Sequence, residues 1–486
     1  VGKPYPTHES RARKQTTVEV AIEEAINKCY REDIADQGAG TAGHSCTSRS
    51  ASSIFEQAKE YGICQGTTEA ILSSFKQQAE RAASQREFYR EPTSLEKGYL
   101  KYIALKRYRQ GKWKLDPDWL TKQHYYRVVR GLDRQSSPGI PFVSEASTNA
   151  EWFKMDAFGN SDEVQLERMW MFVTEVLTGD FDHHFRVFAK DEMYKPEKMK
   201  TGRWRLIIAS SLPVQIAWHM VFGNFYENIV TDPYATPSCY GLIYPGGGWR
   251  RFKNYLKMHS MNYCIDKSAW DFNAPGWVFH LWKEIQYELL EDPRKDAWNK
   301  YATLLMKDAF ETSLLHFPDG TMYKQEFSGF MKSGLVGTID LNSSAQVLIS
   351  DLACHRLNRP FKRIKATGDD TIENGPVDEE YLHQLQLAGC IVKEVVKGYQ
   401  FMGFDVEQFE PLYPAKHLAT LMWCKEELRE EIINSYMMIY ANSIHRPLMK
   451  QIATNLGITL PKTEYEYKFW LNDPRALEQG CLQIKV

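Results

Sequence analysis

Two adjacent carboxylates, Asp369 and Asp370, follow a glycine in the segment KATGDDTIE, between two stretches that could be strands. A third carboxylate, Asp266, ends the short apolar stretch YCID, where a single Asp would usually only cap the next turn. If these side chains meet, they repel one another unless a cation neutralises them, and hard oxygen ligands favour Mg²⁺, with Mn²⁺ able to substitute. Such ions activate an attacking hydroxyl and stabilise a leaving phosphate oxygen. The three carboxylates therefore indicate phosphoryl transfer.

Two local elements are expected near these carboxylates. Gly368 allows a tight hairpin between RIKAT and TIE, because glycine tolerates backbone angles that other residues avoid. The segment MKSGLVGTIDLNSS predicts a glycine-rich loop, Ser333 to Thr338, that enters a helix with Asn342 and Ser343 on its first turns. Amides and hydroxyls at a helix start suit sugar and phosphate recognition, but Ser-Gly before a helix is often only an N-cap. Both interpretations stay open on spacing alone.

The composition describes the kind of chain that carries these residues. A chain of 486 residues predicts two or three subdomains, and 43% hydrophobic with 25% charged residues is typical of a globular protein. Lys and Arg total 60 against 62 Asp and Glu, so no global signal for polyanion binding exists. The nine cysteines form no C-x-x-C pair, which indicates a reducing compartment and no structural zinc. We find no apolar run of membrane-spanning length and no signal pattern, and expect neither a membrane span nor secretion.

Basic residues concentrate in two stretches of this nearly neutral chain. Residues 101–134 hold ten basic and three acidic residues with six interleaved Tyr and Trp, which suits a groove following a nucleic-acid strand but equally a solvated helical face. Residues 186–205 hold seven basic residues against three acidic ones. The segment WRLIIASS then predicts a strand, followed by a helix from Leu212 through Tyr226. The small-residue patch at 38–53 predicts an extended loop, and SSPGIPF predicts a turn.

Taken in chain order, from about Ser136 to Val406, these segments resemble the motifs of viral RNA-dependent RNA polymerases. SSPGIPF resembles the template-entry loop, and KDEMYKPEKMKTGRWRLIIASS resembles the basic finger motif that contacts the incoming triphosphate. DKSAWD is similar to motif A, SGLVGTIDLN to motif B and GDD to motif C, while AGCIVKEVVKG and FMGFDV are looser matches to motifs D and E. In the motif E segment, FMGF stands where a Cys-Ser or Leu-Lys pair is more familiar in this family. The amino-acid sequence of these motifs is similar to that of positive-strand polymerases of the picornavirus supergroup, and in particular to the sobemovirus-like branch of that supergroup.

The resemblance implies roles for the catalytic residues. Asp266 and Asp369 would ligate both metal ions, with Asp370 as a supporting ligand. Lys397, at the motif D spacing, would be the general acid that protonates pyrophosphate, and Lys393 is the alternative.

The resemblance also implies a set of residues that bind nucleotide and RNA. They are Lys190, Arg203 and Arg205 for the triphosphate, Asp271, Thr338 and Asn342 for the ribose 2′-hydroxyl, Ser333 and Gly334 in the loop against the template, and Ser137, Pro138 and Gly139 at template entry.

The implied fold is α+β, a closed right hand whose palm has an antiparallel sheet flanked by helices and whose thumb is helical. By resemblance, the fingers occupy 1–206, including an N-terminal fingertip extension, and 274–330. The palm occupies 207–273, with motif A, and 331–408, with motifs B to E. The thumb occupies 409–486.

The implied function is RNA-directed RNA synthesis in the replication and transcription of a viral genome, in a replication complex in the host cell cytoplasm. Its partners would be an RNA template, the product duplex and NTPs. A small thumb accompanies protein-primed initiation in this family, so we expect a tyrosyl, VPg-like primer peptide, with de novo initiation as the alternative. Membrane contact would occur only through other replication proteins.

Two rival functions share parts of this pattern. A reverse transcriptase-like polymerase also pairs Asp residues on a hairpin, but it would need a bulky residue near Asp271 to exclude the 2′-hydroxyl. A non-catalytic RNA-binding replication protein could retain the same fold, although all three metal-ligand positions are intact here.

Overall fold

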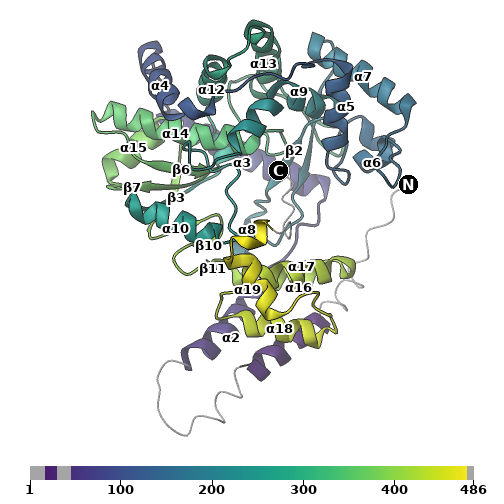
Figure 1. The fold of residues 1–486 in the computed structure, drawn as a ribbon, viewed down its shortest axis with the longest axis vertical. Helices are drawn as coiled ribbons and strands as arrows, with labels where there is room; N and C mark the ends of the chain where they lie inside the picture. Colours follow the sequence, from purple (N-terminus) through teal and green to yellow (C-terminus); the bar gives the residue numbers. More distant parts are fainter. Residues whose placement is uncertain (1–16, 30–44, 479–486) are drawn as a thin grey trace.

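The computed structural model describes residues 17–29 and 45–478. Figure 1 shows two larger sheets and their helices in the upper part of the molecule, with α16 to α19 below them beside α2. Among the described residues, no helix is long and apolar enough to cross a membrane.

The central sheet is antiparallel and has the order β6-β7-β3-β8. Its strands are β3 (Met261–Lys267), β6 (Ile364–Thr367), β7 (Asp370–Asn374) and β8 (Val392–Lys397). The apolar residues of β3 lie between β7 and β8, with Ile265 opposite Thr371 and Val395. β6 and β7 form the predicted hairpin, in which Thr367 pairs with Asp370 and Gly368 has a φ of +63°. The expectation for the hairpin is therefore confirmed.

The second sheet has the order β2-β1-β4-β5 and lies toward the side of α5, α7 and α9. Its strands are β1 (His184–Ala189), β2 (Leu206–Ala209), β4 (Leu314–His316) and β5 (Met322–Lys324). A small third sheet consists of β9 (Gln400–Phe401), β10 (Phe404–Asp405) and β11 (Glu410–Pro411). The expected strand and following helix are β2 and α9, so this expectation is also confirmed.

Helices cover both larger sheets. They are α3 (Thr68–Gln85), α4 (Ser94–Arg107), α5 (Lys122–Gly131), α6 (Asn149–Trp152), α7 (Glu163–Thr178), α8 (Pro196–Thr201), α9 (Leu212–Ile229), α10 (Gly248–Met258), α11 (Trp270–Asn273), α12 (Gly276–Leu289), α13 (Lys295–Phe310), α14 (Thr338–Arg356) and α15 (Glu379–Leu387), with short 3₁₀ turns η1 (Arg86–Phe88), η2 (Arg109–Gly111) and η3 (Phe142–Ser144). α14 is buried all round from Asp340 to Cys354 and packs on β6, α12 and α15, so it is the central helix of this core.

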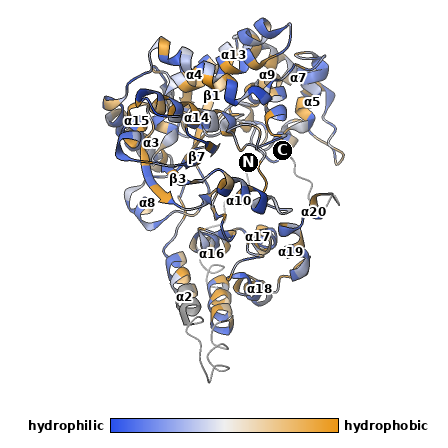
Figure 2. Cartoon of the chain, turned by 60° about the vertical axis from the view of Figure 1, so that its left-hand side comes forward, coloured by the Kyte–Doolittle hydropathy of each residue, from blue (hydrophilic) through white to orange (hydrophobic). Residues whose placement is uncertain are grey.

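The C-terminal helices pack against the first described part of the chain. They are α16 (Pro414–Trp423), α17 (Glu426–Ile439), α18 (Arg446–Asn455), α19 (Glu464–Asn472) and α20 (Arg475–Glu478). α2 (Ser45–Lys59) lies against α16, and the Asn455 side chain donates to the Ala21 carbonyl at 2.8 Å. Helix 17–29 and α2 thus share one apolar core with the C-terminal helices. In Figure 2, surface helices such as α2 and α18 carry hydrophilic and hydrophobic residues side by side, as helices with one buried face do.

The prediction of an extended loop over residues 38–53 is partly wrong, because residues 45–53 are helical in α2. Packing of this helix against α16 overrides the weak helix preference of its Ser and Thr residues. Residues 38–44 of that loop, parts of the expected fingertip extension (1–16 and 30–44) and the thumb end at 479–486 lie outside the described residues.

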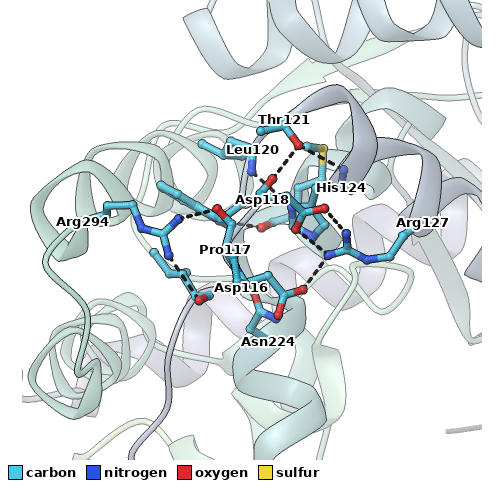
Figure 3. Close-up of polar contacts among 12 residues, drawn as sticks. Asp116, Pro117, Asp118, Leu120, Thr121, His124, Arg127, Asn224 and Arg294 are labelled. Carbon is cyan, nitrogen blue, oxygen red and sulfur yellow. Dashed lines mark hydrogen bonds and ion pairs between the residues drawn. The ribbon is translucent and has the colours of Figure 1, made fainter.

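The aromatic residues of 101–134 mostly belong to the core. Tyr108, Trp113, Trp119 and Tyr125 are buried and cannot stack on bases. Figure 3 shows that Arg127 instead binds Asp116 and Asp118, with Nη2–Oδ distances of 2.6 and 3.0 Å. The groove interpretation is therefore wrong for these four aromatic residues, and they do not form the alternative solvated face either, because they are core residues.

Asp340 is a fully buried acid inside α14. Its Oδ2 accepts the Trp282 indole N–H at 2.8 Å, and its Oδ1 has no hydrogen-bond partner among the described residues. Burial raises the pKa of Asp340 to about 7. The folded protein therefore keeps this proton over a pH range in which an unfolded Asp, with a pKa near 4, has lost it.

This difference predicts that Asp340 makes the fold less stable as pH rises from about 4 to about 7, because the folded state binds the extra proton in that window. Asp340→Asn keeps an acceptor for Trp282 and cannot titrate. Between pH 5 and pH 7.5, the Tm of this variant should therefore rise relative to the Tm of the wild type. The corresponding relative gain in the free energy of unfolding is roughly 2 kcal/mol. Asp180→Asn, at an exposed position, is the control. Parallel Tm curves for Asp340→Asn and the wild type would contradict the prediction.

Candidate active site

Strand pairing brings the three predicted metal ligands to one edge of the central sheet. β3 and β7 run antiparallel with Ile265 opposite Thr371, so the next position along the ladder sets Asp266 across from Asp370. Asp369 lies in the turn that precedes β7. Asp266 and Asp369 are exposed and Asp370 is partly buried, so two of the three carboxylates face solvent.

These carboxylates interact electrostatically. The pKa of Asp370 is raised to about 6. Burial is the largest cause and the charges of Asp369 and Asp266 add to it, while a 2.8 Å hydrogen bond from the Met402 amide and the charge of Lys267 oppose it. Burial and Asp369 likewise raise the pKa of Asp271 to about 7, although Arg205 and Lys190 act in the opposite direction. The edge of the sheet is thus a site where negative charge is costly and a cation would be stabilised.

Two lysines supply positive charge at this edge. Lys393 forms an ion pair with Asp266. The buried Lys267 donates to the Thr371 hydroxyl and, at 2.9 Å, to the Ile265 carbonyl. Burial lowers the pKa of Lys267, and the charges of Asp369 and Asp370 oppose that shift.

The donor set fits a hard divalent cation, although it is not closed around one. In the part of the chain that the structure describes, no three His, Cys, Asp or Glu side chains are close enough together to hold a metal ion as they stand. Asp266 points its carboxylate at Lys393, while Asp369 is exposed. Rotation of these two exposed side chains toward the partly buried Asp370 would complete an oxygen-ligand set of the type that Mg²⁺ prefers.

Of the two candidate general acids, the structure brings Lys393 and not Lys397 to the carboxylates. The β3–β8 register shifts between Asp266 and Lys267, which leaves Lys393 as the extra residue of β8 beside Asp266. Lys397 pairs with Tyr263 at the other end of the ladder, with its Nζ 5.8 Å from the ring centroid. The role of Lys397 stays a prediction, and the geometry favours the alternative.

The loop before α14 is fixed to β2 by hydrogen bonds. The Ser333 hydroxyl donates to the Leu206 carbonyl at 3.1 Å, and the Gly334 amide donates to the Ile208 carbonyl at 3.0 Å. A Cβ on Gly334 would lie 2.8 Å from the Ala209 Cα, so only glycine allows this approach.

Two of the three residues expected to read the ribose form hydrogen bonds within the protein. The Thr338 hydroxyl donates to the Leu335 carbonyl at 2.5 Å, and Asn342 Oδ1 accepts the Trp270 indole N–H at 2.8 Å. Trp270 directly precedes Asp271 on α11, so Asn342 contacts the neighbour of that acid. Recognition of the 2′-hydroxyl by these three residues stays a prediction.

The expected triphosphate clamp is only partly assembled. Lys190 and Arg205 are joined by a 2.8 Å backbone hydrogen bond, and both charges act on Asp271. The Arg203 side chain instead donates to the Thr201 hydroxyl at 3.2 Å, within its own loop.

The expected template-entry turn lies against the start of α9. The Leu212 amide donates to the Pro138 carbonyl at 2.8 Å. Gly139 has a φ of +69°, and a Cβ there would lie 2.8 Å from the Ser210 carbonyl oxygen. The Ser137 hydroxyl accepts from Arg186 Nη1 at 3.5 Å.

Comparison with known proteins decides the family. Residues 89–365 match the family model described as "Viral RNA-dependent RNA polymerase". The chain belongs to this family. It is 24% identical over 353 residues to the replicase polyprotein P2AB of Southern cowpea mosaic virus, covering 66% of the chain and 34% of the polyprotein. It is 25% identical over 263 residues to the genome polyprotein of Ljunganvirus 1, covering 53% and 11%.

A solved structure shows the same fold. The Sicinivirus 3Dpol RNA-dependent RNA polymerase has a TM-score of 0.60 and 17% identity, over 80% of this chain and 87% of that one. The right-hand polymerase fold and the resemblance to the picornavirus supergroup and its sobemovirus-like branch are therefore confirmed. The chain spans about a third of the sobemovirus polyprotein and a smaller share of the picornavirus-like one.

Within this polymerase fold, the structure adds two residues at the site. The buried Ser343 hydroxyl accepts the Gly368 amide at 2.9 Å and donates to the Ile339 carbonyl at 2.6 Å, which links α14 to the GDD turn. Tyr413 is half exposed, and burial with the charges of Asp370 and Asp266 raises its pKa. The sequence indicates Ser343 only as a hydroxyl at a helix start that suits sugar or phosphate recognition, not as a contact of the GDD turn, and Tyr413 carries no signal of its own.

The Ser343 link predicts that Ser343→Ala loosens the GDD turn, because the Gly368 amide loses its acceptor. Hydrogen–deuterium exchange of the peptide covering Gly368 should become about tenfold faster or more.

Ser350→Ala is the matched control. It removes another buried hydroxyl from α14, one whose hydrogen bond goes to the Tyr381 hydroxyl at 2.7 Å and not to the turn. Equal exchange of the Gly368 peptide in both variants would contradict the role assigned to Ser343.

Proposed function

We propose that the chain is an RNA-directed RNA polymerase, which copies a viral RNA template by nucleotidyl transfer. The observation that carries the proposal is the convergence of Asp266, Asp369 and Asp370 at one edge of an antiparallel sheet in a member of this family. The rival functions have no such support, since Asp271 stands where a DNA-making enzyme would need a bulky residue, and every expected metal ligand is present.

The carboxylates hold the reacting centre. Asp266 and Asp369, with Asp370 in support, would bind Mg²⁺ or Mn²⁺, which supplies activation of the primer 3′-hydroxyl and stabilises the leaving pyrophosphate. Asp271 lies beside these carboxylates and next to Trp270, which binds Asn342. Its carboxyl would accept the ribose 2′-hydroxyl, and a buried acceptor left unpaired by a deoxyribose explains rejection of 2′-deoxynucleotides.

Basic side chains near these carboxylates would bind the triphosphate. Lys190 and Arg205 already act on Asp271, and the planar guanidinium of Arg205 suits two phosphate oxygens. Lys393 would pass from Asp266 to the pyrophosphate and donate its proton there. Arg203 would first have to leave Thr201.

The domain plan follows the sheets and helices. The palm, expected at 207–273 and 331–408, would hold the central sheet, and the thumb, expected at 409–486, would hold α16 to α20. The fingers, expected at 1–206 and 274–330, would hold the second sheet except residues 207–209 of β2, which fall in the palm range. The partners would be RNA template, product duplex and NTPs, with a tyrosyl primer peptide at initiation and other replication proteins for membrane contact. The setting would be a replication complex in the host cell cytoplasm.

Replacement of one carboxylate tests the reaction. Asp369→Asn should lower Mg²⁺- or Mn²⁺-dependent NTP incorporation on a primed homopolymer template by more than about a hundredfold, because a charged ligand is lost. RNA binding, measured by fluorescence polarisation, should change little.

Asp319→Asn, in an exposed turn, controls for a general effect of losing an acid. Synthesis that persists in Asp369→Asn would rule out the assignment of this residue. A wild-type chain that used 2′-deoxy-NTPs as well as NTPs would speak for a reverse transcriptase-like enzyme.

The two candidate general acids can be separated directly. Lys393→Met should lower kcat for single-nucleotide incorporation by about a hundredfold, within the range for loss of a proton donor, whereas Lys397→Met should stay close to the wild type. The two variants are matched, since both lysines lie on β8 and are exposed. The reverse order of activities would restore Lys397 as the general acid.

A further inference from the structure

Glu192 lies between two cations that come from distant parts of the chain. Its side chain is only 13% exposed and accepts from Lys416 Nζ at 2.9 Å and from Arg205 Nη1 at 3.4 Å. Glu192 and Arg205 belong to the segments that flank α8, whereas Lys416 lies on the first turn of α16 among the C-terminal helices. One carboxylate therefore joins the fingers to the thumb at the edge of the expected triphosphate site.

The surroundings of Glu192 are strongly cationic. Burial lowers the pKa of both Lys190 and Lys198, and the nearby charges of Arg205 and Lys416 lower it further. Burial alone would raise the pKa of Glu192, but the hydrogen bond from Lys416 and the charges of Arg205 and Lys190 outweigh it and leave the pKa lowered. Glu192 is thus held as an anion inside a group of four cations.

The position of Lys416 is set independently of the fingers sheet. α16 begins with Pro414, packs against α2 and buries Leu418 and Leu421 in the apolar core of the C-terminal helices. Arg205, in contrast, directly precedes β2 of the second sheet. Packing holds α16 and strand pairing holds β2, and the two ion pairs of Glu192 link side chains from these separately held elements. Removal of one partner would leave the mostly buried Glu192 carboxylate uncompensated, which costs more than the loss of an exposed pair.

We propose that Glu192 and Lys416 are positioning residues, which hold Arg205 and Lys190 in the orientation that binds the triphosphate of an incoming NTP. Docking of α16 against the fingers would then complete the triphosphate site, so the thumb takes part in nucleotide binding without touching the nucleotide. The proposal rests on the polymerase function proposed above.

A positioning role and a simple charge effect predict opposite results at Glu192. If Glu192 acted only through its negative charge, its neutralisation would strengthen triphosphate binding by removing a repulsion. If it positions Arg205 and Lys190, its neutralisation weakens binding, because these side chains lose their fixed partner. The direction of the change in KM therefore separates the two.

The experiment measures KM and kcat for GTP incorporation by the full chain on poly(rC) primed with oligo(rG). Glu192→Gln and Lys416→Met should each raise KM about tenfold, the size expected for loss of a charge-assisted hydrogen bond, with kcat within about threefold of the wild type. The double variant should be no worse than the poorer single variant, because both act through one link. Lys416→Arg, which reaches the same carboxylate, should restore a KM close to the wild type.

Lys257→Met is the matched control, since Lys257 on α10 forms a 2.7 Å pair with Glu407, between β10 and β11. Circular dichroism and Tm verify that each variant is folded. Provided that the wild type is active, any one of three results would overturn the proposal. They are an unchanged or lower KM for Glu192→Gln, additive effects in the double variant, and no rescue by Lys416→Arg. A folded wild type that incorporates no GTP would overturn the polymerase function, and this inference with it.

Discussion

Mutual repulsion between carboxylates is the constraint around which the site is built. Asp266, Asp369 and Asp370 meet where β3 ends and the β6–β7 turn begins, and Asp271 follows within one short helix. Lys393 pairs with Asp266, and the buried Lys267 interacts electrostatically with Asp369 and Asp370. Burial, followed by the charges of Asp369 and Asp266, raises the pKa of Asp370, and the charge of Lys267 offsets that shift only in part. Electrostatic repulsion among these carboxylates favours binding of a divalent cation and, next to that cation, of a polyphosphate.

The surrounding elements keep this edge of the sheet in place through side-chain contacts to backbone. Ser343 on the buried α14 accepts the amide of the GDD turn, and Ser333 attaches the preceding loop to β2. β2 continues back to Arg205, which Glu192 connects to Lys416 on α16. The carboxylates, the nucleotide loop and the cations of the fingers therefore share one connected framework. Its last connection reaches the thumb.

The sequence alone was sufficient where local patterns decide the structure. Gly368 between two strand-forming stretches predicted the hairpin, and the branched apolar residues before Leu212 predicted β2 and α9. Contacts between distant residues were not visible in this way. A register shift between Asp266 and Lys267 brings Lys393 to the carboxylates in place of Lys397, and no spacing rule encodes such a bulge. Glu192 and Lys416 are 224 residues apart, so only the packing of α16 reveals their ion pair.

Cation binding by the carboxylates, in the absence of RNA and nucleotide, tests the account most directly. Titration of the wild type with Mn²⁺, followed by the loss of the free-ion EPR signal, should show binding that weakens by about tenfold or more in both Asp266→Asn and Asp369→Asn. The account predicts that the two variants are affected alike, because both side chains belong to one site. Equal Mn²⁺ affinity in the wild type and both variants would contradict it.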